Sequence, residues 1–217
     1  MKMRSIFSLL LVGLAVAAPT VTVNRDVTPV EARDNTIEPR QATSVIFNSV
    51  TASGTGCPSG SYSVTISPSK DVATIGFRQY SAVLPSPATR DCKITISLTY
   101  PGGCTSGSLQ GTTHGWAQVN SGVTGTYTTS YTSTTGNNAN PPASTFSGSS
   151  WAGGNSFTKT DTAPAKVINR SPNNAGVTVT VNTSAKLSSG SGGDLTPDDM
   201  TFRIINQSRN PNWQTCT

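Results

Sequence analysis

The chain has 217 residues, a formal net charge of +5 and a single histidine, His114. Beyond residue 41 it contains no glutamate and six aspartates, so it offers few of the side chains that general acid–base catalysis mainly uses. The basic residues are scattered along the chain, whereas nucleic-acid-binding proteins usually cluster them on one face or segment. This inventory argues against nucleic-acid binding and favours a protein without enzymatic activity.

The N-terminus has the pattern of a secretory signal peptide. Lys2 and Arg4 precede an apolar run over residues 6–18, and Ala15-Val16-Ala17 fits the A-x-A cleavage pattern. The run is shorter than the roughly 20 residues that a membrane-spanning helix needs. We therefore predict a signal peptide over residues 1–17, a secreted, extracellular protein, and no membrane association after cleavage.

Residues 18–40 differ in character from the leader and from the remainder of the chain. They combine prolines with mixed charges and show no sustained hydrophobic period, so we expect them to be disordered. A processing protease that cuts after Arg40 would leave Gln41 as the new N-terminus, so the segment is either a removed pro-segment or a retained tail. Residues 41–217 are long enough to bury the core of a single domain.

Polar and apolar residues alternate in several short windows from residue 41 onward, which is typical of half-buried β-strands. The clearest windows are 61–67, 93–100 and 177–182, and the weaker ones are 45–50, 72–77, 113–119, 125–131, 144–146, 157–161 and 200–205. Clusters of Gly and Pro separate them, and no window longer than ten residues has a helical period. We predict an all-β, antiparallel β-sandwich, with a closed β-barrel as the alternative, and long loops over 132–143 and 188–198.

Four cysteines follow the leader: Cys57, Cys92, Cys104 and Cys216. An even number of cysteines in a secreted chain predicts two disulfides, and the short paired spacings of a zinc site are missing from the sequence. The four residues after Tyr100 are too few to retrace the strand that begins at Cys92, which argues against a Cys92–Cys104 bond. Two pairings remain: Cys57–Cys92 with Cys104–Cys216, which we prefer, or Cys57–Cys104 with Cys92–Cys216.

A series of short motifs runs in order from residue 54 to residue 216. It includes Gly54-Thr55-Gly56-Cys57-Pro58, Phe77-Arg78-Gln79-Tyr80, Arg90-Asp91-Cys92, Gly115-Trp116-Ala117, Thr158-Lys159-Thr160-Asp161, Arg170-Ser171-Pro172 and Trp213-Gln214-Thr215-Cys216. This series resembles the domain-of-unknown-function 4360 family of small secreted fungal proteins. The resemblance implies secretion and the fold, and it implies no settled activity. In that family a cysteine follows the Ser-Pro turn, where this chain has Asn173, so Cys104 is the unusual cysteine and could supply the partner of Cys216.

His114, Trp116 and Gln118 are expected on the same face of the strand over 113–119, because side chains two residues apart share a face. A tryptophan beside polar side chains could stack on a sugar ring, so these three residues form our candidate ligand face. In the alternative interpretation Trp116 belongs to the core and His114 lies near the strand edge. Trp151, in a Gly/Ser-rich run, is a second candidate on a loop, and Trp213 is expected to pack beside a disulfide.

Asp194, Asp198 and Asp199 lie in a segment rich in Gly and Ser. Their spacing matches no standard calcium loop, and two adjacent aspartates on one strand would face opposite sides, which makes a poor glycosidase pair. A serine triad could use only His114, and the G-x-S-x-G motif is missing. We therefore assign no catalytic residue, no metal site and no cofactor.

Asn169, Asn182 and Asn206 each begin an N-x-S sequon for N-glycosylation. Asn182 and Asn206 are the better pair, because Pro172 follows the sequon of Asn169. All three are predicted glycosylation sites, and glycosylation requires that they lie at the surface.

These observations, together with the family resemblance, favour a secreted, disulfide-stabilised, non-enzymatic and monomeric protein. It would act at the fungal cell wall or as an extracellular surface-binding or effector protein, with cell-wall polysaccharide or a host surface as its partner. The alternative from another class is an aspartate-dependent, carbohydrate-active hydrolase.

Overall fold

The computed structural model describes residues 45–86, 88–99, 103–134, 136, 138–163, 168–171 and 176–210. All of them belong to the compact unit Pro39–Thr217. The predicted signal peptide over 1–17 and the segment 18–40 lie outside these ranges and stay predictions. None of the helices within the described ranges has the length and apolar character that crossing a membrane requires.

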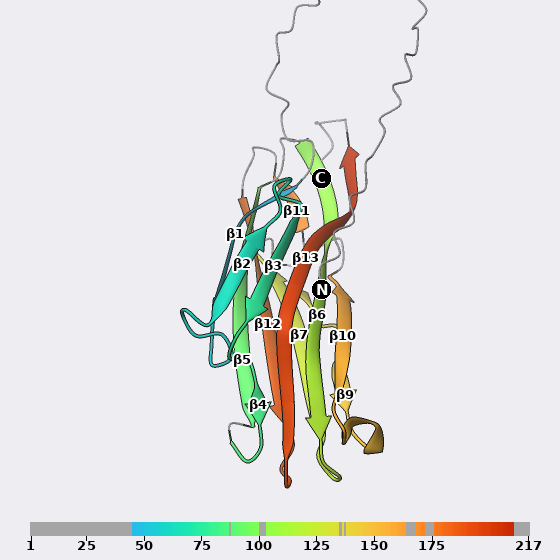
Figure 1. Ribbon diagram of the computed structural model, residues 1–217. Helices are drawn as coiled ribbons and strands as arrows, with labels where there is room; N and C mark the ends of the chain where they lie inside the picture. Colours follow the sequence, from blue (N-terminus) through green and yellow to red (C-terminus); the bar gives the residue numbers. More distant parts are fainter. Residues whose placement is uncertain are drawn as a thin grey trace, which may run out of the picture. The chain divides into compact units, whose positions relative to one another are not determined.

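Two antiparallel sheets form a β-sandwich (Figure 1), which we call sheet A and sheet B. Sheet A has the strand order β1-β5-β12-β7-β8, and β9 also pairs with β7. Its strands are β1 (Ile46–Ser53), β5 (Thr89–Thr99), β7 (Gly125–Ser133), β8 (Asn138–Ala139), β9 (Ser144–Phe146) and β12 (Gly176–Leu187).

Sheet B has the strand order β10-β6-β13-β3-β2, with β11 also paired to β6 and β4 to β13. Its strands are β2 (Tyr62–Ile66), β3 (Val72–Phe77), β4 (Ala82–Val83), β6 (Gly103–Val119), β10 (Asn155–Thr162), β11 (Ile168–Ser171) and β13 (Gly193–Asn210). A 3₁₀ turn, η1 (Ser149–Trp151), precedes β10. The prediction of an antiparallel β-sandwich is confirmed, and the closed-barrel alternative is wrong because two separate sheets face each other.

The core lies between the two sheets and follows from the alternation of the strands. On β5 the side chains of Ile94, Ile96 and Leu98 are fully buried, while the residues between them face outward. On β12 the same alternation buries Val179 and Val181. Each strand therefore contributes one apolar face to the core and one polar face to the surface.

Two predicted loops are partly strand. β8 interrupts the expected loop over 132–143, and the expected loop over 188–198 is wrong from Gly193 onward, where β13 begins. Pro197 lies inside β13, at a shift of the β13–β6 register between Pro197 and Asp199. A proline within a sheet is tolerated at such a bulge, because the ladder hydrogen bonds are already interrupted there.

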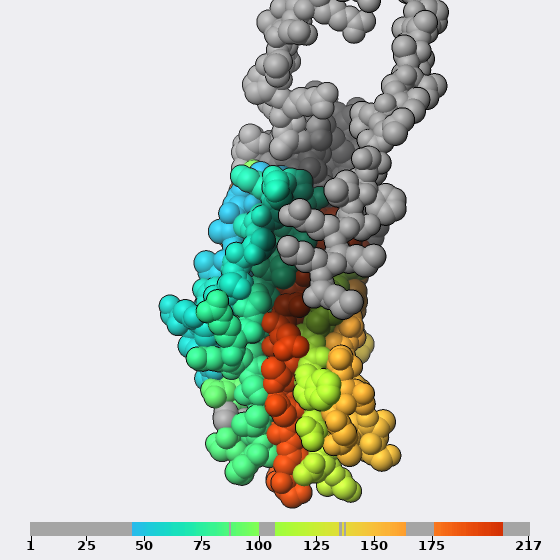
Figure 2. All heavy atoms as spheres, viewed as in Figure 1, coloured from blue at the N-terminus to red at the C-terminus, as the bar shows by residue number. Residues whose placement is uncertain are grey.

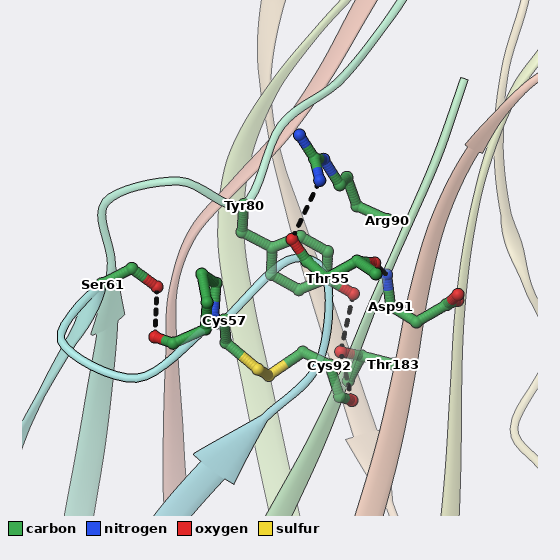
Figure 3. The surroundings of a disulfide bond; sticks show 9 residues. Thr55, Cys57, Ser61, Tyr80, Arg90, Asp91, Cys92 and Thr183 are labelled. Atoms are coloured by element: carbon green, nitrogen blue, oxygen red, sulfur yellow. Dashed lines mark hydrogen bonds between the residues drawn. A yellow bond between two sulfur atoms is a disulfide. The ribbon is translucent and has the colours of Figure 1, made fainter. Parts of the chain in front are cut away.

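A disulfide joins Cys57, after β1, to Cys92 on β5, with the two Cα atoms 5.5 Å apart (Figure 3). This bond confirms half of the preferred pairing and rules out the alternative that joined Cys57 to Cys104. Tyr80 and Thr183 lie beside the bond, and their hydroxyl oxygens are 2.8 Å apart. The predicted Cys104–Cys216 bond involves side chains outside the described part of the chain and stays a prediction.

The glycines of the Gly54-Thr55-Gly56-Cys57 motif leave the space that this arrangement needs. Gly54 has a φ of 146°, and a Cβ atom there would lie 2.3 Å from the carbonyl oxygen of Asp91. A Cβ atom on Gly56 would lie 2.4 Å from the Tyr80 ring. The motif therefore serves close packing around the disulfide.

Candidate ligand-binding face

His114, Trp116 and Gln118 lie on β6 with their side chains on the outer face of sheet B. The intervening Gly115 and Ala117 are buried. The His114 side chain is 50% exposed, and Trp116 is 40% exposed. Trp116 is the one large hydrophobic side chain that is exposed within the described ranges, so it is not a core residue.

Gly115 fixes which side chains of β6 face outward. A Cβ atom at Gly115 would lie 2.5 Å from the carbonyl oxygen of Thr196 and 2.7 Å from the Phe157 ring. Only glycine fits this inward position without displacing either neighbour. Because strand side chains alternate, the residues on either side of Gly115 are directed to the surface.

The segment between η1 and β10 supports Trp116 from one side. A Cβ atom on Gly154 would lie 2.1 Å from Cζ2 of Trp116, and Gly154 has a φ of 78°, which favours glycine. Gln118 Nε2 donates a hydrogen bond to the carbonyl oxygen of Ala152, at 3.4 Å. The Trp116 ring is therefore held against backbone while two-fifths of the residue's surface stays open to solvent.

Strand β13 places polar side chains beside these three residues, and Figure 2 shows β13, β6 and β10 side by side on one face of the molecule. The facing pairs are Gln118 with Asp194, Trp116 with Thr196 and His114 with Asp199. On the other side of β6, Ser156 of β10 pairs with Trp116, and Thr158 pairs with His114. Hydroxyl, amide, imidazole and carboxylate groups thus surround one exposed indole.

The register shift in β13 changes the direction of its aspartates. Pro197 and Met200 are buried, Asp198 between them is exposed, and the side chain of Asp199 is 37% exposed. The expectation that Asp198 and Asp199 would face opposite sides is therefore wrong, because the bulge inserts one extra residue and breaks the alternation.

The carboxylates of this face influence one another. Oδ1 of Asp199 lies 3.0 Å from Nδ1 of His114. Oδ1 of Asp194 accepts hydrogen bonds from the hydroxyls of Ser81, at 2.8 Å, and Thr196, at 2.6 Å. Partial burial raises the pKa of Asp198, the negative charges of Asp199 and Asp194 raise it further, and His114 acts in the opposite direction. Within the described ranges, no group of three or more His, Cys, Asp or Glu side chains is placed to hold a metal ion.

The other candidate residues are placed differently. Trp151 is half-buried and packs against Phe146 in a T-shaped arrangement, with the ring centroids 4.8 Å apart, so it is less exposed than Trp116. Asn182 is exposed on the outer face of sheet A. The side chains of Asn169 and Asn206, and all of Trp213, lie outside the described part of the chain.

Sequence reasoning missed a buried ion pair. Lys159 and Asp161, both on β10, form this pair, and each side chain is 6% exposed. The Thr129 hydroxyl donates to Asp161, and Nζ of Lys159 lies 3.3 Å from the same hydroxyl oxygen. The burial of this pair could have been predicted from the alternation of β10, because Lys159 and Asp161 share a strand face with the buried Phe157. These groups join β10 of sheet B to β7 of sheet A inside the sandwich.

The fold and this face define a disulfide-containing β-sandwich protein with an exposed aromatic residue on one polar sheet surface. A family model described as "Domain of unknown function (DUF4360)" matches residues 43–216, so the chain belongs to this family. The family resemblance seen in the sequence is confirmed.

A relative from Arthroderma benhamiae is described as an "Uncharacterized secreted protein" and is 36% identical over 87 residues. That match covers 38% of this chain and 36% of the relative, so the chain spans about a third of the relative's length. The prediction that this protein is secreted is confirmed by this similarity.

Two solved structures show a weak likeness. The first is TmCBM61 in complex with β-1,4-galactotriose, with a TM-score of 0.27 and 14% identity, covering 73% of this chain and 90% of that one. The second is the enzymatically active domain of tailspike protein 4 of bacteriophage CBA120, with a TM-score of 0.24 and 12% identity, covering 76% of this chain and 20% of that one. Similarities this low indicate nothing about what this chain binds.

Proposed function

We propose that the protein is a non-enzymatic carbohydrate-binding protein that acts at the fungal cell wall. Its binding surface is the outer face of sheet B around Trp116, and its ligand is a cell-wall polysaccharide. The observation that carries the proposal is the exposure of Trp116 in a chain whose other large hydrophobic side chains, within the described ranges, are at least partly buried. Tryptophan is enriched at binding interfaces, because its large apolar ring carries a polar N–H group.

The chemistry of this face matches that of a sugar. A pyranose ring has C–H groups on its faces, which pack against an indole, and hydroxyls on its rim, which need hydrogen-bond partners. Neighbouring strands lie about 4.8 Å apart, so Thr196 and Ser156 flank Trp116 at a distance that suits the rim of one ring. Asp194 and Gln118 continue the polar surface along the strands, as a chain of several sugars would require.

One observation supports a second candidate function, an aspartate-dependent glycoside hydrolase. The bulge in β13 brings Asp198 and Asp199 to the same side, and the raised pKa of Asp198 is the property that a general acid needs. Against this candidate, Asp198 is exposed, so water is not excluded from it. We therefore favour binding without hydrolysis.

Sedimentation of the protein with insoluble chitin, β-1,3-glucan and cellulose tests the proposal. The wild type is expected to bind at least one of them, Trp116→Ala to lose that binding, and Trp116→Phe to retain part of it. Lys186→Ala, an exposed change on the other sheet, is the control and should bind as the wild type does. Equal binding of Trp116→Ala and the wild type would refute the proposal.

Release of reducing sugar from the same polymers separates the two candidates. The proposal expects no turnover by the wild type. Turnover that disappears in Asp198→Asn, with sedimentation unchanged, would establish the hydrolase instead.

A further inference from the structure

A groove of about 530 Å³ lies on the opposite side of the molecule from Trp116, on the outer face of sheet A. Its floor is formed by β5, β12 and β7, and its two walls by the end of β1 and by the segment after β8, which includes Pro141 and Ala143. This volume lies within the range of about 300–1,000 Å³ that is typical of small-ligand sites. The groove is large enough to hold a ligand of one or two sugar units.

Asn182 occupies the middle of the groove floor. It lies on β12 between Lys93 of β5 and Ser130 of β7, and its side chain is exposed. Asn182 begins the sequon Asn182-Thr183-Ser184, and Asn182 and Ser184 both line the groove. Thr183 between them is 3% exposed and faces the core, so the alternation of β12 directs Asn182 outward.

We propose that Asn182 carries an N-linked glycan and that the first sugars of this glycan lie in the groove and cover the outer face of sheet A. In the transfer, Nδ2 of Asn182 bonds to the anomeric carbon of an N-acetylglucosamine held on a lipid-linked diphosphate donor. The carbon–oxygen bond to the diphosphate breaks, and the amide nitrogen loses one proton. The passage of the chain through the secretory route brings it to this donor.

The groove lining complements N-acetylglucosamine. Asp91 can accept hydrogen bonds from sugar hydroxyls, and Lys93 can donate them to hydroxyl and acetamide oxygens. Pro141 and Ala143 give an apolar wall for the acetamide methyl group. Because the glycan is covalently attached within the groove, lying there does not carry the translational and rotational cost of association, which favours contact between its first sugars and the groove.

The pairing of β12 within sheet A also limits the time at which Asn182 can be glycosylated. Asn182 lies in a strand paired on both sides, and its neighbour Thr183 is buried and donates a hydrogen bond to the Cys92 carbonyl oxygen, at 3.2 Å. A modifying enzyme needs the sequon in an accessible, extended form. The transfer therefore precedes the pairing of β12 with β5 and β7.

The two exposed lysines of this face provide a matched test. Lys93 lines the groove, whereas Lys186, on the same outer face, does not. The full chain is secreted from a glycosylating eukaryotic host, the glycan at Asn182 is located by peptide mapping, and acetylation rates of the two lysines are measured. Ser184→Ala, which destroys the sequon and keeps Asn182, serves as the unglycosylated reference.

We expect occupancy of Asn182, several-fold slower acetylation of Lys93 in the wild type than in Ser184→Ala, and equal rates at Lys186. An unmodified Asn182 would overturn the proposal, and so would a modified Asn182 with equal Lys93 rates, because the glycan would then extend into solvent. Asn182→Gln is the second unglycosylated variant, and thermal melts of both show that the fold is retained. Binding through Trp116 lies on the other sheet and is measured separately.

Discussion

Nδ1 of His114 lies 3.0 Å from Oδ1 of Asp199, and the two side chains are brought together by the bulge in β13 at Asp198. The inserted residue leaves Asp199 opposite His114 and adds a third carboxylate, Asp198, to the same surface. One local irregularity thus adds negative charge to the proposed binding face.

Asp198→Asn should stabilise the protein at neutral pH. Because burial and the two neighbouring carboxylates raise the pKa of Asp198, the folded state favours its protonated form. The corresponding stability is present at low pH and is lost as the pH rises through the raised pKa. The variant should therefore gain up to about 0.5 kcal/mol at pH 7, the usual range for surface changes, and nothing at pH 3.

Melting temperatures of Asp198→Asn and the wild type from pH 3 to pH 8 measure this effect. Asp71→Asn is the control of opposite sign, because hydrogen bonds from Ser69 and Ser67 lower the pKa of Asp71. Its stability contribution is present above the unfolded pKa and lost at low pH, so Asp71→Asn should be less stable at pH 7. A destabilised Asp198→Asn at pH 7 would contradict the described surroundings of this carboxyl.

Gly154→Ala should displace Trp116. The added methyl group would overlap Cζ2 of Trp116, and the φ of 78° is unfavourable for alanine. We expect a loss of about 1–3 kcal/mol in the free energy of unfolding and weaker polysaccharide binding. Denaturant melts and sedimentation measure the two effects. Gly153→Ala is the matched control, since a Cβ atom there would meet no neighbour within 4 Å, and an equal loss in both variants would show that Trp116 does not depend on Gly154.

Lys159→Met should be strongly destabilising. It leaves the Asp161 carboxylate buried without its cationic partner, which typically costs about 3–5 kcal/mol. In the double variant Lys159→Met/Asp161→Leu both charges are gone, and its cost should be much smaller than the sum of the two single changes. Denaturant unfolding of the four proteins of this cycle gives the coupling, and additive costs would show that the two groups do not interact.

Removal of the Cys57–Cys92 disulfide should cost about 4 kcal/mol in the chain-entropy description, because the two cysteines are 35 residues apart. The variant Cys57→Ala/Cys92→Ala, compared with the wild type in denaturant, measures this loss. Cys104→Ala/Cys216→Ala examines the second predicted bond in the same assay. A loss below about 1 kcal/mol for the first variant would contradict a stabilising role for this disulfide.

The sequence predicted strands well where apolar residues alternate strictly, as at Ile94, Ile96 and Leu98, because alternation reports burial of one face directly. It did not predict the first ten residues of β6 or the start of β13. These stretches are rich in Gly and Ser or contain Pro197, residues with low strand propensity. β6 and β13 pair with each other over most of their length, and this pairing stabilises them as strands despite their low local strand propensity.

The candidate site, too, was predictable from the sequence only in part. The common face of His114, Trp116 and Gln118 follows from residues two apart on one strand. Its neighbours on β13 depend on which strands pair and on a bulge, and the support from Gly154 depends on how a distant segment folds back. These are relations between residues far apart in the sequence, so a local pattern does not contain them.

The strand order has a consequence for how the protein is made. β12 lies between β5 and β7, and β13 lies between β6 and β3, so the interior of each sheet is completed by residues from the last quarter of the chain. Until these residues have entered the secretory compartment, four strands expose unpaired edges that could join other chains. The nascent chain must therefore be kept from aggregating until β12 and β13 have been made, and truncation before β12 should yield an insoluble product rather than a smaller domain.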